Sequence, residues 1–219
     1  MIKGAIFDLD GTIFDSNPIW SNIGERYLLS IGVTPKENLS EAFRTASLYQ
    51  AACHIVEEYK VHFTVDEIMD GVNKLVENFY MNEAPLKSGV YEFLQSLNEM
   101  GVKMCVATAT DRHLVSAALE RVGISDFFSE IFTCNSVGAS KDKPKIFRDA
   151  LTHLKTEKAL TPVFEDSLFA LITAKNDGFP VVGIKDDEEK NPDKMRYEAH
   201  YYLDNYNDID ELLDFLNAF

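Results

Sequence analysis

Short apolar segments with the pattern of buried β-strands alternate with helical segments along most of this sequence. The strand-like runs lie at residues 3–9, 102–107, 130–133, 162–164, 180–184 and 200–203, and helical patterns lie between most of them. Because parallel strands can be joined only by long crossover connections, this order is typical of β-α-β units. The sequence therefore predicts an α/β fold built on a doubly wound, parallel, Rossmann-like sheet.

The alternation is interrupted after the first strand. Residues 16–82 contain helical patterns and no convincing strand, whereas strands and helices alternate again further along the chain. The simplest arrangement is an all-helical domain at residues 16–82, inserted into an α/β core made of residues 1–15 and 83–219. An amphipathic helix over residues 209–219 is expected to close the chain.

Helix-start signals support the all-helical interpretation of the inserted region. Asn17-Pro18 places a good capping residue before a proline that suits the first helical turn. One helix is expected over residues 37–60. Thr64 and Glu67 then have the spacing of a capping box, followed by apolar residues at helical intervals.

The sequence is strongly acidic. It carries 21 Lys and Arg residues against 36 Asp and Glu residues, a formal net charge of −15. A surface of this charge lacks the basic character that binds nucleic acid or anionic lipid, so neither is an expected partner. A small anionic substrate would likewise need cations placed locally at its binding site.

The sequence has no feature of a secreted or membrane-inserted protein. Its N-terminus lacks the regions of a signal peptide, and no apolar run is long enough to span a bilayer. The three cysteines, Cys53, Cys105 and Cys134, are few and odd in number, so we expect buried free thiols and no disulfide framework. We expect a monomeric protein of the cytoplasm.

Residues that can carry chemistry stand at the ends of the predicted strands. They are Asp8 and Asp10 after the first strand, Thr108 and Ala109 after the second, Lys141 after the third, and Glu165 and Asp166 after the fourth. Ligands of open α/β sheets bind beyond the carboxyl ends of the strands, so these residues are expected on one edge. Crowded carboxylates repel each other unless a cation is bound. Oxygen ligands without a nearby His or Cys favour Mg²⁺.

The spacing of Asp8 and Asp10 suits phosphoryl transfer. Two residues apart on an extended segment, their side chains point to the same side. One carboxylate can attack phosphorus and form an acyl-phosphate, while the other protonates the leaving oxygen and later activates water. Thr108, the backbone amides beside it and Lys141 offer donors and positive charge to the phosphoryl oxygens.

The order of these residues resembles the four motifs of the haloacid dehalogenase superfamily of phosphatases and phosphomutases. The motifs stand here as Phe7-Asp8-Leu9-Asp10-Gly11-Thr12, Thr108, Lys141 ahead of Pro144-Lys145-Ile146-Phe147, and Phe164-Glu165-Asp166-Ser167. The resemblance covers the whole chain and is closest to the subgroup of phosphoglycolate phosphatases and β-phosphoglucomutases. It implies that residues 16–82 form a helical cap.

The resemblance also implies a role for each motif residue. Asp8 would be the nucleophile and a metal ligand, and Asp10 the general acid–base, with its main-chain carbonyl on the metal. Thr108, Ala109 and Lys141 would hold the phosphoryl group. Asp166 would bind Mg²⁺ directly, and Glu165 directly or through water. The implied activity is Mg²⁺-dependent hydrolysis of a small phosphorylated metabolite, which the sequence does not name.

Three alternatives stay open. The subgroup's third motif is usually Lys-Pro-x-Pro, whereas this chain has Lys141-Asp142-Lys143-Pro144, so Lys143 is an alternative phosphate-binding lysine. A sugar-phosphate mutase is the runner-up activity, but related mutases carry a histidine where this chain has Trp20, a residue we expect to pack inside the helical domain. A phosphorylated signalling or binding module is the third possibility, although receiver domains have no place for residues 16–82.

Overall fold

The computed structural model describes residues 1–43, 46, 48–207 and 209–217. The chain divides into two compact units, one made of Met1–Asp15 with Ala84–Phe219 and the other of Ser16–Glu83. Within the described residues, no helix is long and apolar enough to cross a membrane.

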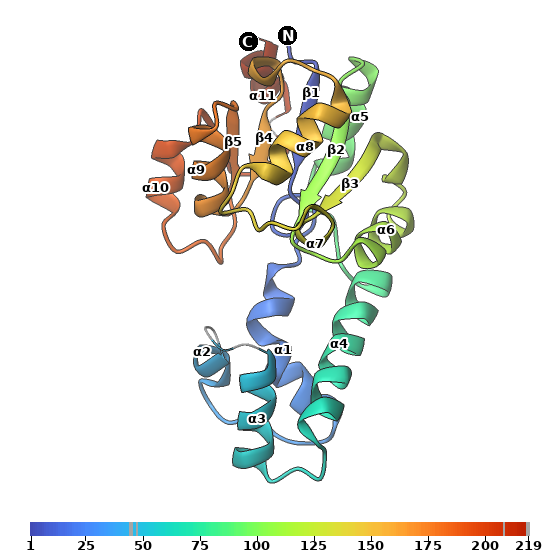
Figure 1. The fold of residues 1–219 in the computed structure, drawn as a ribbon, viewed down its shortest axis with the longest axis vertical. Coiled ribbons are helices and arrows are strands. Elements are labelled where there is room, and N and C mark those ends of the chain that lie inside the picture. The colour runs from blue at the N-terminus through green and yellow to red at the C-terminus, as the bar shows by residue number, and fades with distance from the viewer. Residues whose placement is uncertain (44–45, 47, 208, 218–219) are drawn as a thin grey trace. The chain divides into compact units, whose positions relative to one another are not determined.

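The first unit is built on one six-stranded sheet. Its strands are β1 (Gly4–Phe7), β2 (Lys103–Thr108), β3 (Phe128–Thr133), β4 (Val163–Glu165), β5 (Val181–Ile184) and β6 (Tyr201–Leu203). The strand order is β3-β2-β1-β4-β5-β6, and every neighbouring pair is parallel (Figure 1). The predicted α/β fold with a parallel, doubly wound sheet is confirmed.

Helices connect the strands. They are α5 (Val90–Glu99), α6 (Arg112–Arg121), α7 (Cys134–Val137), α8 (Lys145–Leu154), α9 (Leu168–Asn176), α10 (Pro192–Glu198) and α11 (Ile209–Asn217), with 3₁₀ turns at Ser125–Phe127 and Lys158–Leu160. The expected continuation of the last helix to residue 219 lies outside the described residues. Helix α10 was not predicted, although Asn191-Pro192 repeats the start signal seen at Asn17-Pro18.

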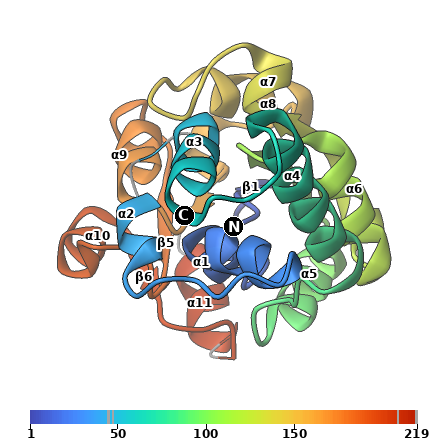
Figure 2. The ribbon, with the colours of Figure 1, turned by 90° about the horizontal axis from the view of Figure 1, so that it is seen from below.

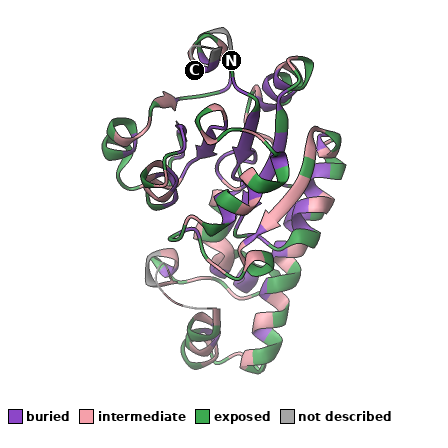
Figure 3. Cartoon of the chain, turned by 45° about the horizontal axis from the view of Figure 1, so that its top comes forward, coloured by how far each residue is buried: buried purple, intermediate pink, exposed green. Residues whose placement is uncertain are grey.

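Both faces of the sheet are covered. Ile6 points to the face that packs against α8 and α9, where it joins one apolar cluster with residues such as Phe147 and Leu171. Phe7 points to the opposite face and meets Phe93 of α5, with 6.2 Å between the ring centroids. Central strands buried on both faces explain the nearly continuous apolar runs in the sequence (Figure 3).

In the described residues of the second unit there are four helices, α1 (Asn17–Ser30), α2 (Leu39–Phe43), α3 (Leu48–Tyr59) and α4 (Val65–Asn82) (Figure 2). They enclose an apolar core of their own, formed by Tyr27, Leu28, Leu39, Ala52, Ile55, Ile68 and Val72. The capping box before α4 is present as predicted, with the Thr64 hydroxyl accepting from the Glu67 N–H. A separate core gives this unit its own source of stability.

The structure corrects three expectations for this unit. The helix expected over residues 37–60 begins only at Leu39, because Asn38 has a φ of +64°, and it is divided into α2 and α3. Ser16, not Asn17, occupies the N-cap of α1. Trp20 does not pack inside the unit: its side chain is 47% exposed, and its ring approaches Tyr80 at 6.4 Å between centroids.

The two chain segments that lead out of and back into the α/β unit are paired with each other. Phe14 and Leu86 form an antiparallel bridge. The Asp15 N–H donates to the Pro85 carbonyl at 2.9 Å, and the Lys87 N–H donates to the Ile13 carbonyl at 2.9 Å. The Ala84 carbonyl accepts from the Arg121 guanidinium. The chain therefore leaves the α/β unit before residue 16 and returns to it after residue 83 through two segments that are hydrogen-bonded to each other.

Two separate constraints, one on the backbone conformation and one on space, favour glycine at position 89, the N-cap of α5. Its φ is +81°, which L-residues with a side chain rarely adopt. A Cβ at this position would lie 2.7 Å from the carbonyl carbon of Tyr206. Gly101, at φ +73°, is subject only to the backbone constraint, because a Cβ there would have no other atom within 4 Å.

We expect Gly89→Ala to lower the free energy of unfolding by about 2–4 kcal/mol, through left-handed strain plus overpacking against Tyr206. Gly101→Ala, the matched control, should cost only about 1–2 kcal/mol, from strain alone. Urea unfolding followed by circular dichroism measures both values. Equal losses would show that the backbone at Tyr206 moves aside without cost.

Candidate active site

The pairing of β1 with β4 brings two acidic residues together. Phe7 lies opposite Phe164 in the register, and the two rings stack with centroids 4.3 Å apart. The Asp8 N–H donates to the Phe164 carbonyl at 3.0 Å, so Asp8 and Glu165 leave the sheet side by side. Strand order reverses between β1 and β4, and this is where open α/β sheets bind their ligands.

Asp8, Glu165 and Asp166 form what we call the acid cluster. Each offers a carboxylate oxygen, and these oxygens all lie within 4.8 Å of one another; this is the group of possible metal ligands found among the described residues. All three side chains are buried, Glu165 completely. The oxygens are hard ligands of the kind that suits Mg²⁺, and their burial favours binding of a cation.

Lys141 neutralises part of the acid cluster. Its ammonium donates to Asp8 Oδ1 and, at 2.5 Å, to Glu165 Oε1. Burial alone would disfavour the charged lysine, but the two carboxylates outweigh it and raise the pKa of Lys141. Burial, helped by the charge of Asp8 and opposed by Lys141, raises the pKa of Glu165 to about 7. One lysine therefore leaves the cluster with an excess of negative charge.

Asp10 lies in a tight loop just beyond Asp8. The Leu9 carbonyl accepts from the N–H groups of Thr12, Ile13 and Phe14, and the chain turns at Gly11, whose φ is +71°. The hydroxyl of Thr110, beyond the end of β2, donates to Asp10 Oδ2 at 2.5 Å. This bond fixes one oxygen of Asp10, which is less buried than Asp8.

The structure separates the two candidate lysines. Lys141 is buried in contact with the acid cluster, whereas Lys143 is exposed. At the end of β2, Ala109 is exposed and Thr108 is fully buried, with its hydroxyl accepting the Thr110 N–H at 3.1 Å. The hydroxyl hydrogen of Thr108 can still be donated to an anion. The residues predicted from the strand ends thus gather on one edge of the sheet.

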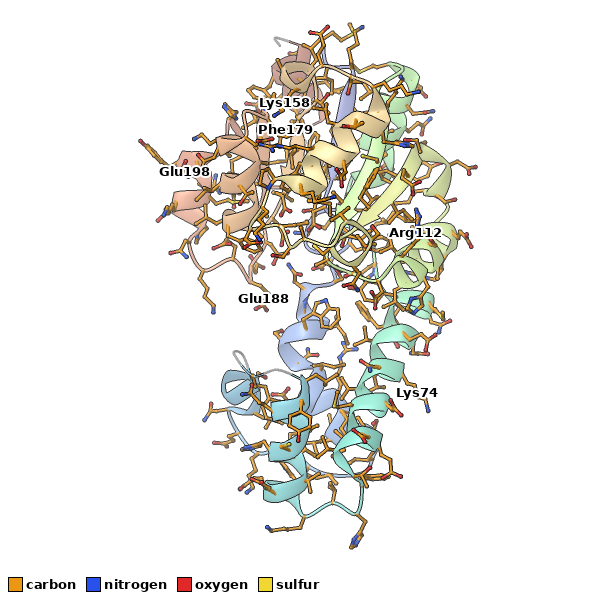
Figure 4. All side chains as sticks on the ribbon, viewed as in Figure 1. Lys74, Arg112, Lys158, Phe179, Glu188 and Glu198 are labelled. Carbon is orange, nitrogen blue, oxygen red and sulfur yellow. The ribbon has the colours of Figure 1, made fainter. Side chains whose placement is uncertain are left out.

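Sequence reasoning missed several contacts made by residues that follow the strands. Thr110 follows the second strand, but no sequence pattern assigns it a role. The run of acids at residues 186–189 has the composition of a solvated turn, and Glu188 is indeed exposed (Figure 4). Asp186, however, is buried and paired with Lys87 at 3.0 Å. Glu189 Oε2 accepts the N–H of Leu168 at 3.0 Å, at the start of the helix that follows Asp166.

Among the described residues, no cysteine belongs to the group of possible metal ligands, although Cys134 lies near enough for the charges of Lys141 and Asp8 to act on its thiol. Cys105 is buried as expected, but Cys53 and Cys134 are only partly buried, and all three are free thiols. Desolvation raises the pKa of Cys134, which keeps its thiol protonated near neutral pH. The interpretation of all three as buried core residues is therefore wrong for two of them.

Curated relatives share most of their length with this chain. A validoxylamine A 7'-phosphate phosphatase of Streptomyces hygroscopicus subsp. limoneus is 28% identical over 188 residues, which are 84% of this chain and 86% of the relative. A phosphoglycolate phosphatase of Rhodobacter capsulatus is 28% identical over 209 residues, 92% and 93% of the two chains. Both are named for phosphate-releasing reactions.

Solved structures share the fold. A Thermotoga maritima crystal structure named after β-phosphoglucomutase has a TM-score of 0.85 at 20% identity, covering 97% of this chain and 99% of its own. CbbY from Rhodobacter sphaeroides, solved in complex with phosphate, has a TM-score of 0.72 at 21% identity, covering 95% and 96%. The family model described as haloacid dehalogenase-like hydrolase matches residues 5–184. The chain therefore belongs to the haloacid dehalogenase-like hydrolases.

Proposed function

We propose that this protein is a Mg²⁺-dependent phosphatase that hydrolyses a small phosphorylated metabolite through an aspartyl-phosphate on Asp8. The observation that carries the proposal is the acid cluster with Lys141 at the switch point of the sheet. Relatives named as phosphatases of validoxylamine A 7'-phosphate and phosphoglycolate support the substrate class. A parallel sheet with donors and acids gathered at one edge suits phosphoryl transfer, which needs positioning and positive charge above all.

In the first step, an Asp8 carboxylate oxygen attacks phosphorus and the bond from phosphorus to the leaving oxygen breaks. Asp10, in its protonated form, gives its proton to that oxygen, and the Thr110 hydroxyl holds Asp10 in place. In the second step, Asp10 takes a proton from water, the water oxygen bonds to phosphorus, and Asp8 is released as a carboxylate. Phosphate is the product.

Asp8 and Asp166 would hold the metal, with Glu165 binding it directly or through water and Asp10 contributing its main-chain carbonyl. A bound Mg²⁺ would supply positive charge beside the transferring phosphoryl group. Lys141 and the donors at Thr108 and Ala109 would stabilise the remaining phosphoryl oxygens.

Residues 16–82 act, in this proposal, as a cap that selects the leaving group and limits the access of water during the first step. The independent apolar core of this unit is compatible with such a role. We further propose that the protein works as a monomer in the cytoplasm, with no nucleic-acid or membrane partner, consistent with its net charge of −15 and its free cysteines.

The first experiment measures Mg²⁺-dependent phosphate release from sugar phosphates, phosphoglycolate, nucleotides and an aryl phosphate. Asp8→Asn should lower the rate on the order of 10³-fold or more, because the amide is not a nucleophile. Asp15→Asn, the same change at a nearby exposed aspartate, is the matched control and should leave the rate unchanged.

A folded wild-type protein that releases no phosphate from any compound would refute the hydrolase proposal. Interconversion of sugar 1-phosphates and 6-phosphates would then identify a mutase. Turnover that survives in Asp8→Asn would instead remove Asp8 from the mechanism.

The two lysines give a second test. Lys141→Ala should lower kcat/KM by roughly 10²–10³-fold, because a buried cation stabilises the developing charge far better than an exposed one. Lys143→Ala should stay within about twofold of the wild type, as expected of an exposed residue. Steady-state kinetics on the best substrate decide between them, and the opposite ranking would assign the phosphate to Lys143.

Protons and Mg²⁺ should compete for the acid cluster. Burial raises the pKa of Glu165 from 4.5 to about 7. Between these two pH values, Glu165 is therefore protonated in the metal-free folded state and ionised in the unfolded state. The stability from this group is complete below about pH 4.5 and is lost as the pH rises through about 7. Mg²⁺ should therefore stabilise the protein more at pH 8 than at pH 6.

Thermal melts with and without Mg²⁺ at these two pH values measure the effect. The Mg²⁺ concentration for half of the stabilisation should rise by up to about tenfold per pH unit below 7. Glu165→Gln should remove much of this pH dependence. A Mg²⁺ effect that does not vary with pH would show that Glu165 does not sense the ion.

A further inference from the structure

Tyr206, in the C-terminal segment, inserts its side chain into the interior of the α/β unit, whereas its neighbours Asn205 and Asn207 are exposed. The Tyr206 side chain is 1% exposed, and its ring lies 5.4 Å from that of Phe93 in α5. Its backbone occupies the space left by the missing Cβ of Gly89. The neighbouring Asn207 Oδ1 accepts from the Ser88 hydroxyl at 3.1 Å. These contacts fix where the Tyr206 hydroxyl points.

The Tyr206 hydroxyl donates to the main-chain carbonyl of Thr12 at 3.0 Å. Thr12 is fully buried and belongs to the loop that carries Asp10. Its own hydroxyl donates to Asp166 Oδ1 at 3.3 Å. The two hydrogen bonds of Thr12 therefore connect Tyr206, in the C-terminal segment, with Asp166 of the acid cluster.

A neutral donor is well suited to this position. Burial raises the pKa of Tyr206 well above its usual value, and the charges of Asp166 and Asp8 act in the same direction, so the phenol keeps its proton. A buried carbonyl without a donor is costly, and a main chain that shifts to find one would carry the Thr12 side chain with it. The hydroxyl thus holds Thr12 without adding charge beside the acids.

We propose that Tyr206 is a positioning residue of the active site, which acts through Thr12 to aim the Asp166 carboxylate at the cation-binding position. The C-terminal segment then helps to set the geometry of the site, in addition to its packing within the α/β unit. The catalytic consequence rests on the proposed function, whereas the consequence for cation binding does not.

Tyr206→Phe tests the proposal with little change in packing, because it keeps the ring and removes the hydroxyl. The half-saturating Mg²⁺ concentration should rise by roughly tenfold and kcat should fall by a similar factor, as for other residues that orient a metal ligand. KM for the substrate should change by less than about twofold, since Tyr206 makes no substrate contact in this proposal.

Tyr202→Phe is the matched control. It removes a hydroxyl four residues earlier in the same C-terminal region, from a partly buried ring that lies 4.0 Å from the Arg196 guanidinium. This variant should keep the wild-type kcat and Mg²⁺ requirement. A loss of thermal stability in Tyr206→Phe, with kcat and the Mg²⁺ requirement unchanged, would reduce Tyr206 to a structural residue and overturn the proposal.

Variants of Thr12 test the route. Thr12→Val removes the hydroxyl that bonds to Asp166 and should raise the Mg²⁺ requirement as Tyr206→Phe does, whereas Thr12→Ser should retain wild-type behaviour. Adding Tyr206→Phe to Thr12→Val should cause little further change, because both act on one path. Fully additive effects, or a Thr12→Val variant with an unchanged Mg²⁺ requirement, would refute a path through Thr12.

Failure of the inference can be distinguished from failure of the proposed function. Mg²⁺ binding to the full chain, measured without substrate by calorimetry and by the Mg²⁺-induced shift in melting temperature, reports on Asp166 whether or not phosphate is released. A wild type that binds Mg²⁺ but hydrolyses nothing refutes only the function. Equal Mg²⁺ affinities in wild type and Tyr206→Phe refute only the role of Tyr206.

Discussion

Asp8, Glu165 and Asp166 share a buried edge of the sheet, and like charges placed together away from water repel strongly. The pairing of β1 with β4 imposes this crowding, because the hydrogen bond from Asp8 to the Phe164 carbonyl brings the two strand ends level. Much of the surrounding structure offsets the repulsion. Lys141 supplies a positive charge, and the Ser167 N–H donates to Glu165 Oε2 at 3.2 Å. A site that holds excess negative charge in this way is prepared to bind a cation.

The offsetting groups come from distant parts of the chain. Lys141, which donates to Asp8 and Glu165, precedes α8. Thr12, whose hydroxyl donates to Asp166, follows β1. Pairing in the sheet alone would place the acids, but it would not orient them. Orientation depends on these contacts, which arise only when the whole α/β unit has folded. Local sequence and global fold are therefore linked at one edge of the sheet.

The sequence was sufficient to predict the parallel sheet and the placement of Asp8, Thr108, Lys141 and Asp166 at its edge. Strand ends can be read from apolar runs, and parallel strands bring their carboxyl ends together. Tyr206 and Glu189 could not be found in this way, because each reaches its partner across a long sequence separation that no local pattern records. Trp20 was misplaced for a related reason: α1 has a broad apolar character, and only the packed unit shows which face is buried.

The paired segments at Phe14 and Leu86 have a consequence for how such a chain can change over time. Because both connections to residues 16–83 pass through one hydrogen-bonded bridge, the α/β unit keeps its strand order whatever the excursion contains. Long excursions cost little extra closure entropy when their ends are already held together. Insertions, deletions or replacement of the helical unit during evolution can thus leave the edge of the sheet that carries the acid cluster unchanged.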